Sequence, residues 1–383
     1  MRTVVISFYR AYPPDSGVST VTYNVAKYLP GEKHLIQLSE RANNASIDGN
    51  MNLINLRLLS NNNIIKAANL TLQFPFIIKK IRQLDPEIII LEGASWAVYY
   101  LILFYLVKLC KIEAEIIYHS HNVEYLLRKQ KNNSIIAAIT KWAEGKIIKK
   151  SDLCTAVSEA DAFNFKKIYG IKPLLLPNGV DVGKFDCVTD NQVQKIKVKY
   201  NFGRKNVLFM GLPSFKPNKE AIDFLLKAVF PRVIRENSDA KLSIIGGHTG
   251  YRKKWLINPG SIPFEEVPAF IKACDVCVAP IFSGSGTRLK ILEYMAAAKP
   301  VISTIKGAEG ISVNNGEDIL IADDTSGFVK KILYMLRNSE QADRIGYKGM
   351  KLVKSNYSWQ EIMQDFSKAL YAVCAKNKKT SIK

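Results

Sequence analysis

The chain has 383 residues, of which 48% are hydrophobic, and it carries a formal net charge of +20 at pH 7. The length exceeds that of one typical domain and suits two, each with its own hydrophobic core. The charge favours anionic partners such as acidic lipid headgroups or phosphorylated substrates, and the lack of a zinc-finger or RNA-binding aromatic motif argues against nucleic acid.

Six cysteines are scattered along the sequence, and no signal peptide precedes the first expected strand. Free thiols of this kind are typical of a reducing compartment, so we expect a cytoplasmic protein.

The first half of the chain alternates short apolar strands with helical stretches. Residues 3–7 (TVVIS) predict a buried strand, a Pro/Gly loop follows as far as Gly17, and a helix is expected from about Ser19 to Leu29. Further strands are expected at residues 87–91, 115–118 and 153–157. This alternation indicates a parallel, doubly wound sheet, whose binding residues lie at the carboxyl ends of the strands.

Two apolar segments between these strands are candidates for contact with a membrane. Residues 61–83 mix apolar side chains with Lys and Arg, and they predict either an interfacial helix or an ordinary pair of surface helices broken at Pro75. Residues 93–110 are nearly uncharged but only marginally long enough to span a bilayer, and the strands on either side favour a buried crossover helix.

His119 and His121 follow the strand at residues 115–118, with Asn122 and Glu124 close behind. These side chains are potential metal ligands, but no third ligand with suitable spacing is evident in the sequence.

The strand and helix pattern restarts after Pro177-Asn178-Gly179. Five more strands are expected at residues 207–210, 242–245, 276–279, 301–303 and 319–321. They predict a second α/β unit, with the boundary in the Lys-rich segment 181–200. The tail from Tyr357 is expected to be helical as far as Lys376.

The most informative segment is residues 283–304 (SGSGTRLKILEYMAAAKPVIST), which predict a Gly-rich loop, a short helix and a strand. Gly284 and Gly286 allow a close approach to the backbone. A helix that begins near Thr287 directs free N–H groups at the loop, which suits a phosphate. Arg288 and Lys290 add positive charge there, and Glu293, about two turns into the helix, is an acceptor for sugar hydroxyls. The segment therefore predicts a nucleotide-sugar site.

This segment resembles the donor-binding motif of the retaining GT-B glycosyltransferases of family 4. That motif has two glutamates separated by seven residues, followed by small residues, a proline and an apolar strand. Glu293 matches the second glutamate, which holds the ribose hydroxyls in the family. Ser285 stands in place of the first, which helps to hold the donor sugar, so the chain departs from the family at the sugar ring.

Three other positions in the chain also match the family. His121, in His-Asn-x-Glu, matches a family histidine beside the donor sugar. The loop ending in Gly17 stands where the family has a Gly-rich loop that touches donor and acceptor, and Glu309 lies in a turn that resembles the family's Gly-x-Glu-Gly.

Two cations that neutralise the donor diphosphate in many family members are missing, because Leu212 and Asn218 stand in their places. A leaving diphosphate still needs compensating charge. We expect Arg288 or Lys290, with Lys216 beside them, to supply it, and Arg288 is the preferred ligand because it lies nearer the loop.

The resemblance implies a GT-B fold, in which two doubly wound Rossmann-like domains face a cleft. The expected parts are an acceptor-binding domain at residues 1–182, a nucleotide-sugar-binding domain at 200–356 and a C-terminal helix at 357–376 that crosses back to the first domain.

The implied activity is the transfer of a sugar from a nucleotide diphosphate donor to an acceptor hydroxyl, with retention of configuration. The expected catalytic residues are His121, Arg288 and Lys290. The expected donor-binding residues are Gly17, Lys216, Ser285, Gly286, Thr287, Glu293 and Glu309. No metal ion or cofactor is expected, since the chain has no Asp-x-Asp signature and the family is generally metal-independent.

The basic, apolar first half suggests a lipid-linked saccharide as acceptor, in cell-surface polysaccharide assembly, and a peripheral position on the anionic inner face of the cell membrane. Three alternatives stay open: a sugar-nucleotide epimerase of GT-B type, a nucleic-acid-binding protein, and a catalytically silent sugar-nucleotide-binding protein.

Overall fold

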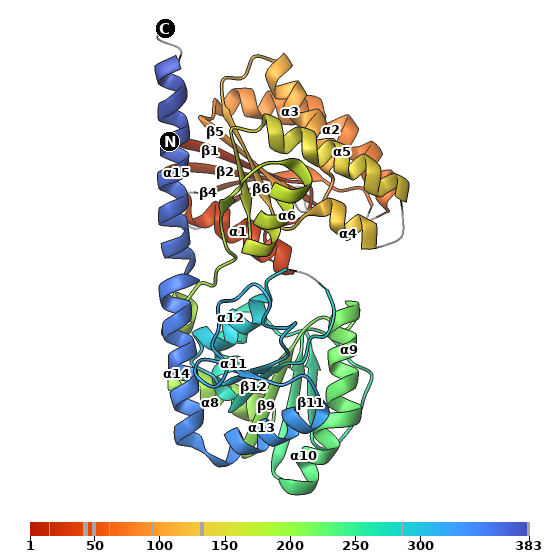
Figure 1. The fold of residues 1–383 in the computed structure, drawn as a ribbon, viewed down its shortest axis with the longest axis vertical. Helices are drawn as coiled ribbons and strands as arrows, with labels where there is room; N and C mark the ends of the chain where they lie inside the picture. The colour runs from red at the N-terminus through yellow and green to blue at the C-terminus, as the bar shows by residue number, and fades with distance from the viewer. Residues whose placement is uncertain are drawn as a thin grey trace. The chain divides into compact units, whose positions relative to one another are not determined.

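The structure is a computed structural model, and it describes residues 1–14, 16–40, 45–47, 51–60, 62–93, 95–130, 134–284 and 286–380. The chain divides into two compact units (Figure 1). The first comprises Met1–Asn178 and Trp359–Lys383, and the second comprises Gly179–Ser358.

The first unit is built on one sheet in the order β3-β4-β2-β1-β5-β6-β7-β8, parallel throughout the described residues except for the antiparallel pair β3 and β4. Its strands are β1 (Arg2–Ser7), β2 (Glu32–Ser39), β3 (Ala45–Ile47), β4 (Met51–Arg57), β5 (Ile88–Gly93), β6 (Glu115–Ser120), β7 (Leu153–Ala156) and β8 (Leu174–Leu175). Its helices are α1 (Gly17–Tyr28), α2 (Asn63–Leu84), α3 (Ala97–Leu109), α4 (Glu124–Gln130), α5 (Ser134–Lys150), α6 (Glu159–Tyr169) and α15 (Trp359–Thr380).

The four strands expected in this unit are present as β1, β5, β6 and β7. Strands β2 and β4 were not predicted, because charged and polar residues interrupt their apolar runs (EKHLIQLS and MNLINLR). Burial decides their structure all the same, since Leu35, Ile36 and Leu38 of β2 are fully buried between the helical layers.

Helix α2 runs unbroken through Pro75, so the expected pair of helices broken at this proline is wrong. Phe74, Ile77 and Ile81 are buried on one face of α2, while Pro75 is exposed. The packing of that apolar face stabilises the helix and outweighs the hydrogen bond that the proline removes.

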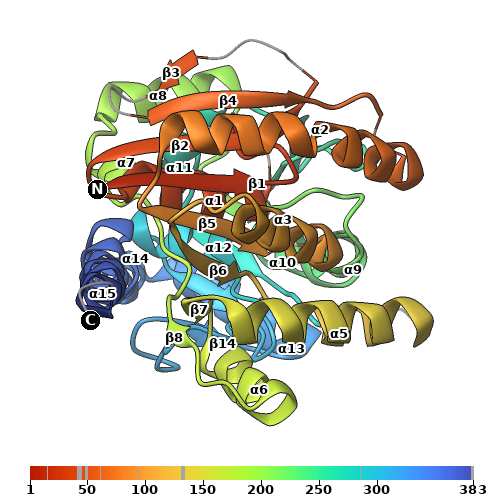
Figure 2. The same ribbon diagram turned by 90° about the horizontal axis from the view of Figure 1, so that it is seen from above.

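Helices α2, α3 and α5 lie side by side on one face of the sheet (Figures 1 and 2). Helix α3 confirms the expected crossover helix, since Tyr100, Leu103 and Phe104 are buried. No helix within the described residues is both long and apolar enough to cross a membrane.

Helix α15 packs against α1 within the first unit (Figure 1). Trp359, at the start of α15, is almost completely buried, and so are Met363, Phe366 and Leu370. These side chains recur every three to four residues, which gives the helix one continuous apolar stripe.

The second unit contains a parallel sheet in the order β11-β10-β9-β12-β13-β14. Its strands are β9 (Lys205–Met210), β10 (Ala240–Ile245), β11 (Leu256–Gly260), β12 (Val276–Ala279), β13 (Val301–Ser303) and β14 (Leu320–Ile321). Its helices are α7 (Gly183–Asp186), α8 (Asp190–Lys199), α9 (Lys216–Phe224), the π-helix η1 (Leu225–Val229), α10 (Phe230–Glu236), the 3-10 helix η2 (Phe264–Glu266), α11 (Val267–Ala273), α12 (Leu289–Ala296), α13 (Thr325–Arg337) and α14 (Ser339–Asn356).

The five strands expected in this unit are present, and β11 was missed. Its sequence, LINPG, contains Pro259 and Gly260, which are confined to sheet edges and irregular positions, and β11 is the edge strand. The Lys-rich segment 181–200, where the boundary was expected, contains α7 and α8 and belongs to the second unit.

Candidate functional site

The loop between β12 and α12 lies over the carboxyl end of the second sheet. Gly284 and Gly286 have positive φ angles of 93° and 81°, a backbone conformation that favours glycine. Arg288, the N-cap residue of α12, donates from its guanidinium to the carbonyl oxygens of Gly286 at 2.6 Å and Ser283 at 3.2 Å. Arg288 therefore holds the loop to the start of the helix and brings its positive charge there.

The helix begins later than expected, at Leu289 instead of near Thr287, which leaves Glu293 about one turn into the helix and not two. Thr287 lies against Gly310, in the turn after β13. The hydroxyl oxygen of Thr287 is buried and has no hydrogen-bond partner among the described residues. An orphaned hydroxyl beside a glycine loop and a helix N-terminus is in a suitable place to donate to a phosphate oxygen.

Lys290 reaches from α12 to the start of α9. Its Nζ donates to Oδ1 of Asn218 at 2.8 Å and lies 4.3 Å from the centroid of the Phe209 ring. Burial, reinforced by the charge of Arg288, lowers the pKa of Lys290 to about 7. The Lys290 ammonium therefore lies beside the Asn218 side chain, at a position where many family members have a lysine of their own.

Glu293 has a displaced pKa as well. Burial raises the pKa of its carboxyl to about 7, although Lys184 and Lys290 act in the opposite direction. A half-buried acid and a half-buried base, both titrating near neutrality on one helix, are typical of a binding site.

Two further predicted residues of the second unit, Lys216 and Glu309, lie at its surface. Lys216 is exposed and forms a loose ion pair of 3.9 Å with Glu220. Glu309 is exposed and binds Lys306 at 2.6 Å. Ser285 lies outside the described residues.

Gly17, which belongs to the first unit, is the first residue of α1 and does not have a positive φ angle. The side chain of Ser16 caps this helix, and Ser16 and Ser19 form a reciprocal capping box. Gly17 is exposed and presents a backbone N–H at the helix N-terminus.

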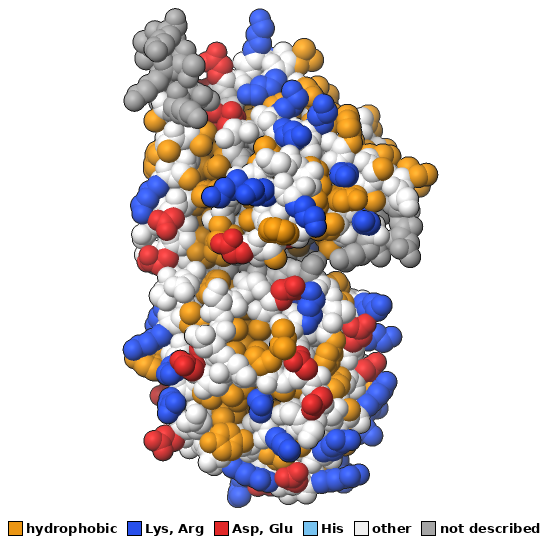
Figure 3. Space-filling view, viewed as in Figure 1, with side chains coloured by type: hydrophobic (Ala, Val, Ile, Leu, Met, Phe, Trp, Pro, Cys, Tyr) orange, Lys and Arg blue, Asp and Glu red, His pale blue; other side chains and the backbone are white. Residues whose placement is uncertain are grey.

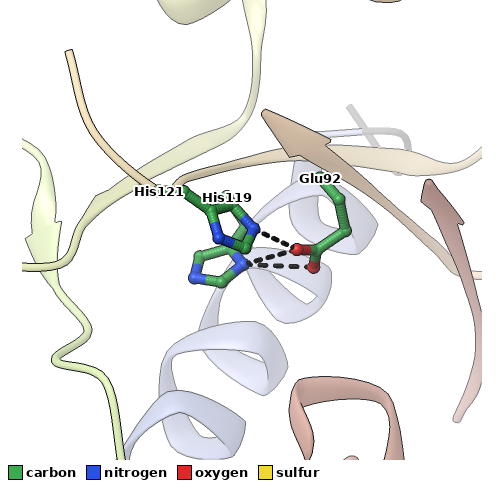
Figure 4. A group of neighbouring side chains, drawn as sticks. All are labelled: Glu92, His119 and His121. Carbon is green, nitrogen blue, oxygen red and sulfur yellow. Dashed lines mark hydrogen bonds and ion pairs between the residues drawn. The ribbon is translucent and has the colours of Figure 1, made fainter. Parts of the chain in front are cut away.

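His121 belongs to a buried polar network at the carboxyl ends of β5 and β6 (Figure 4). Glu92 Oε2 lies 2.6 Å from His121 Nε2, and both carboxylate oxygens lie 3.1 Å from His119 Nδ1. Thr22 donates its hydroxyl to Glu92 Oε2 at 2.7 Å, and the hydroxyl of Tyr9 lies 2.6 Å from that of Thr22 and 3.4 Å from His121 Nε2.

Glu92 is fully buried and determines which ring nitrogen of each neighbouring histidine carries the hydrogen. Burial acts to raise the pKa of Glu92, but the two histidines outweigh it and hold that pKa below the ordinary value. Burial lowers the pKa of His121, which is therefore neutral at pH 7. Because an ionised carboxylate only accepts, His121 Nε2 and His119 Nδ1 carry the hydrogens, which leaves Nδ1 of His121 as an acceptor.

Glu92, His119 and His121 bring three ligand atoms within 4.8 Å of one another. Two imidazoles and a carboxylate are a donor set that divalent transition metals use. Here each of these groups already has a hydrogen-bond partner in another, so the cluster is complete as a polar network. The two histidines were recognisable in the sequence as candidate ligands, but Glu92, the acidic residue that directly follows the expected strand at 87–91, was not.

Solved structures with the same architecture define the fold class. Sucrose-phosphate synthase from Thermosynechococcus elongatus superimposes with a TM-score of 0.78 at 14% identity, covering 98% of this chain and all of that one. HepE of Anabaena, in a complex with UDP-glucose, superimposes with a TM-score of 0.71 at 12% identity, covering 97% and 99%. The fold is therefore GT-B, as expected.

The family follows from the sequence. Residues 16–184 match the family described as Glycosyltransferase Family 4, and residues 204–338 match the one described as Glycosyl transferases group 1. The chain belongs to the group 1, family 4 glycosyltransferases. A relative from Klebsiella pneumoniae, named "Uncharacterized 44.6 kDa protein in cps region", is 30% identical over 182 residues, covering 44% of this chain and 47% of the relative. The chain spans about half the length of the curated relatives it matches first.

Proposed function

We propose that the protein transfers a sugar from a nucleotide diphosphate sugar to an acceptor hydroxyl, with retention of configuration. The second unit binds the donor, and the first unit binds the acceptor and supplies His121. The observation that carries this proposal is the group of Thr287, Lys290 and Glu293 at the start of α12. Thr287 offers an unpartnered hydroxyl just before this helix, and Lys290 and Glu293 offer a positive charge and a hydrogen-bond acceptor on it.

The chemistry depends on stabilising the departing diphosphate. As the bond to the sugar breaks, negative charge grows on the diphosphate, and preorganised charge and N–H groups lower the barrier. Lys290 takes up a proton more readily beside that charge, while Arg288 and the first turn of α12 add fixed positive potential. Glu293 in its ionised form accepts hydrogen bonds from the ribose. No step in this scheme uses a metal ion or a cofactor.

His121 contributes from the first unit, beside the donor sugar. In its neutral form, with Nε2–H directed at Glu92, its Nδ1 can accept a hydrogen bond from a sugar hydroxyl.

The direct test is a transfer assay with the full chain, a radiolabelled nucleotide sugar and a panel of saccharide acceptors. Proton NMR of the product reports the anomeric configuration. We expect a product with the configuration of the donor. An inverted product contradicts the proposed retention, and donor binding without any transfer or hydrolysis favours a silent sugar-nucleotide-binding protein, in line with Ser285.

We further propose that the protein works at an anionic membrane surface, on the inner face of the cell membrane, and that its acceptor is lipid-linked and serves polysaccharide assembly. Helices α2, α3 and α5 carry nine Lys and Arg and a single acidic residue, Glu144. Glu144 is buried and accepts hydrogen bonds from the backbone N–H groups of Glu124 and Tyr125, so it does not offset the surface charge.

Helix α5 exposes the large apolar side chains that a bilayer interface would bury. Ile135 is 74% exposed, Trp142 57%, and Ile136 and Ile139 are 48% each. Lys149 and Lys150 follow at the C-terminal end of the helix. Figure 3 shows hydrophobic and basic side chains intermingled over the region that α3 and α5 occupy in Figure 1. An apolar stripe with basic flanks is the pattern of helices that lie in a membrane interface.

Trp142→Glu tests this assignment in vesicle co-sedimentation. We expect about a tenfold loss of binding to vesicles with anionic lipid at low salt. The matched control is Val198→Glu, which changes an 81% exposed residue of α8 in the second unit. Equal losses in both variants, or no binding of the unaltered protein, would contradict the assignment.

A further inference from the structure

A cavity of about 600 Å³ opens within the first unit, at the carboxyl ends of its central strands. Tyr9 and Arg10 follow β1, Glu40 follows β2 and Trp96 follows β5, and all of them line it. These strands lie next to one another in the sheet. The carboxyl edge of a parallel sheet is where α/β proteins bind ligands, and the volume is in the range of small-molecule sites.

Two cations, Lys66 and Arg10, and one carboxylate, Glu40, line this cavity. Lys66, from the first turn of α2, lies with its Nζ 5.2 Å from the centroid of the Trp96 ring, and Arg10 lines the same space. Burial lowers the pKa of Lys66, because part of its hydration is lost. An anionic group bound beside Lys66 would restore the stabilisation that the ammonium loses.

The start of α1 adds positive potential of the same sign. Ser16 and Val18 line the cavity, and α1 is a twelve-residue helix whose N-terminus they form. Free N–H groups and the helix dipole at this end favour negative charge. The positive potential of the helix N-terminus adds to that of Lys66 and Arg10, and it would not define a site without them.

Trp96 gives the cavity an aromatic wall. Its backbone is left-handed, with φ 69°, which is uncommon for a residue with a side chain. Tyr99 packs edge-on against the indole at 5.3 Å and holds it in place. A flat amphipathic ring beside a cation suits a ligand with both an apolar face and an anionic group.

We propose that this cavity binds the acceptor as a saccharide that carries a phosphate or diphosphate group. The inference rests on the proposed glycosyl transfer and specifies its acceptor class. Lys66, Arg10 and the start of α1 bind the phosphate, and Trp96 packs against the sugar. Tyr9 connects the cavity to the reactive network, because it lines the cavity and its hydroxyl lies 3.4 Å from His121 Nε2.

The test is calorimetric binding to the full chain. The probes are glucose 1-phosphate, N-acetylglucosamine 1-phosphate and pyrophosphate. The methyl glycosides of glucose and of N-acetylglucosamine are the uncharged counterparts. We expect the sugar phosphates to bind at least about tenfold more tightly than the glycosides, since charge-assisted hydrogen bonds are the strong ones. Lys66→Gln should remove that advantage, Lys66→Arg should retain most of it, and Lys79→Gln, an exposed lysine of the same helix, should leave it unchanged.

Equal affinity for the charged and uncharged probes, or equal effects of Lys66→Gln and Lys79→Gln, overturns the inference. A geranyl-diphosphate-linked sugar distinguishes a lipid-linked acceptor from a soluble phosphorylated one. Tighter binding than the free sugar phosphate supports a lipid-linked acceptor, and equal binding supports a soluble phosphorylated one.

A parallel titration with UDP-sugars separates this inference from the proposed function. If no donor binds but sugar phosphates still bind through Lys66, the proposed function fails and the phosphosaccharide site stands. If Lys66→Gln weakens UDP-sugar binding and leaves sugar phosphates unaffected, the cavity holds the donor and the inference is overturned.

Discussion

The two units present their polar groups in different ways. At the start of α12 in the second unit, Lys290 and Glu293 are half-buried, have pKa values near 7 and have few partners of their own. At the end of β5 in the first unit, Glu92 accepts hydrogen bonds from two histidines and a threonine and is fully satisfied. A charged ligand would therefore stabilise the groups at the start of α12. The network around Glu92 instead holds His121 in one tautomer and one orientation. Substitutions should therefore affect ligand binding in the second unit and both stability and activity in the first.

The largest effect is expected at Lys290. Lys290→Ala should lower kcat/KM about 100-fold to 1,000-fold, because a preorganised charge on the leaving diphosphate is lost. The melting temperature should not fall, since a partly desolvated amine is removed. Lys219→Ala serves as the matched control, because Lys219 is an exposed lysine of α9 that has no expected role in binding the donor. Equal losses of turnover in both variants would show that Lys290 has no special role.

Glu92→Gln should have an intermediate effect that appears in two measurements. The amide keeps the shape but loses the charge, and its NH₂ group cannot accept from His121 Nε2–H. We expect a loss of about 1–3 kcal/mol in the free energy of unfolding and about tenfold in kcat.

The control for Glu92→Gln is Glu113→Gln, a change at an exposed position between α3 and β6. A loss of stability without any change in the pH profile of kcat would mean that Glu92 only holds the fold. A change in that profile identifies Glu92 as a positioning residue for His121.

The pH dependence of donor binding should show a smaller effect with a definite sign. Lys290 binds the diphosphate as the ammonium form, which is lost as the pH rises through about 7, and Glu293 accepts from ribose as the carboxylate, which is lost as the pH falls through about 7. Affinity should therefore peak near pH 7 and fall on both sides.

Single variants separate the two limbs of that profile. Lys290→Gln should flatten the alkaline limb and leave the acidic one, and Glu293→Gln should do the reverse. A profile that neither variant alters would contradict the assignment of these two groups.

The same contrast explains what the sequence could predict. The donor site could be predicted because its glycines, its charged residues and the start of its helix all lie in one contiguous segment, residues 283–304. The contact between Lys290 and Asn218 was not predictable, because it joins residues 72 positions apart on two helices. Glu92 was missed for a related reason, since it lies 27 residues before His119 and only the pairing of β5 with β6 brings the two together.

Tertiary packing also overrode local signals in the scaffold. Pro75 predicted a break in α2, but the buried face of that helix keeps it continuous. The apolar pattern of β2 was too interrupted to be recognised, although β2 is a central strand of the first sheet. Local sequence therefore predicted most strands and the fold class, and missed the features that only the neighbours of a segment determine.

Donor recognition by the second unit is the central claim, and saturation-transfer NMR tests it most directly. The full chain would be screened against UDP-, GDP-, ADP- and dTDP-sugars, with Glu293→Ala as the test variant and Glu317→Ala, at an exposed glutamate of the same unit, as the control. We predict that one nucleotide class binds to the unaltered protein and to Glu317→Ala and that its signal is lost in Glu293→Ala. Binding that survives in Glu293→Ala, or no binding of any nucleotide sugar, would contradict the account.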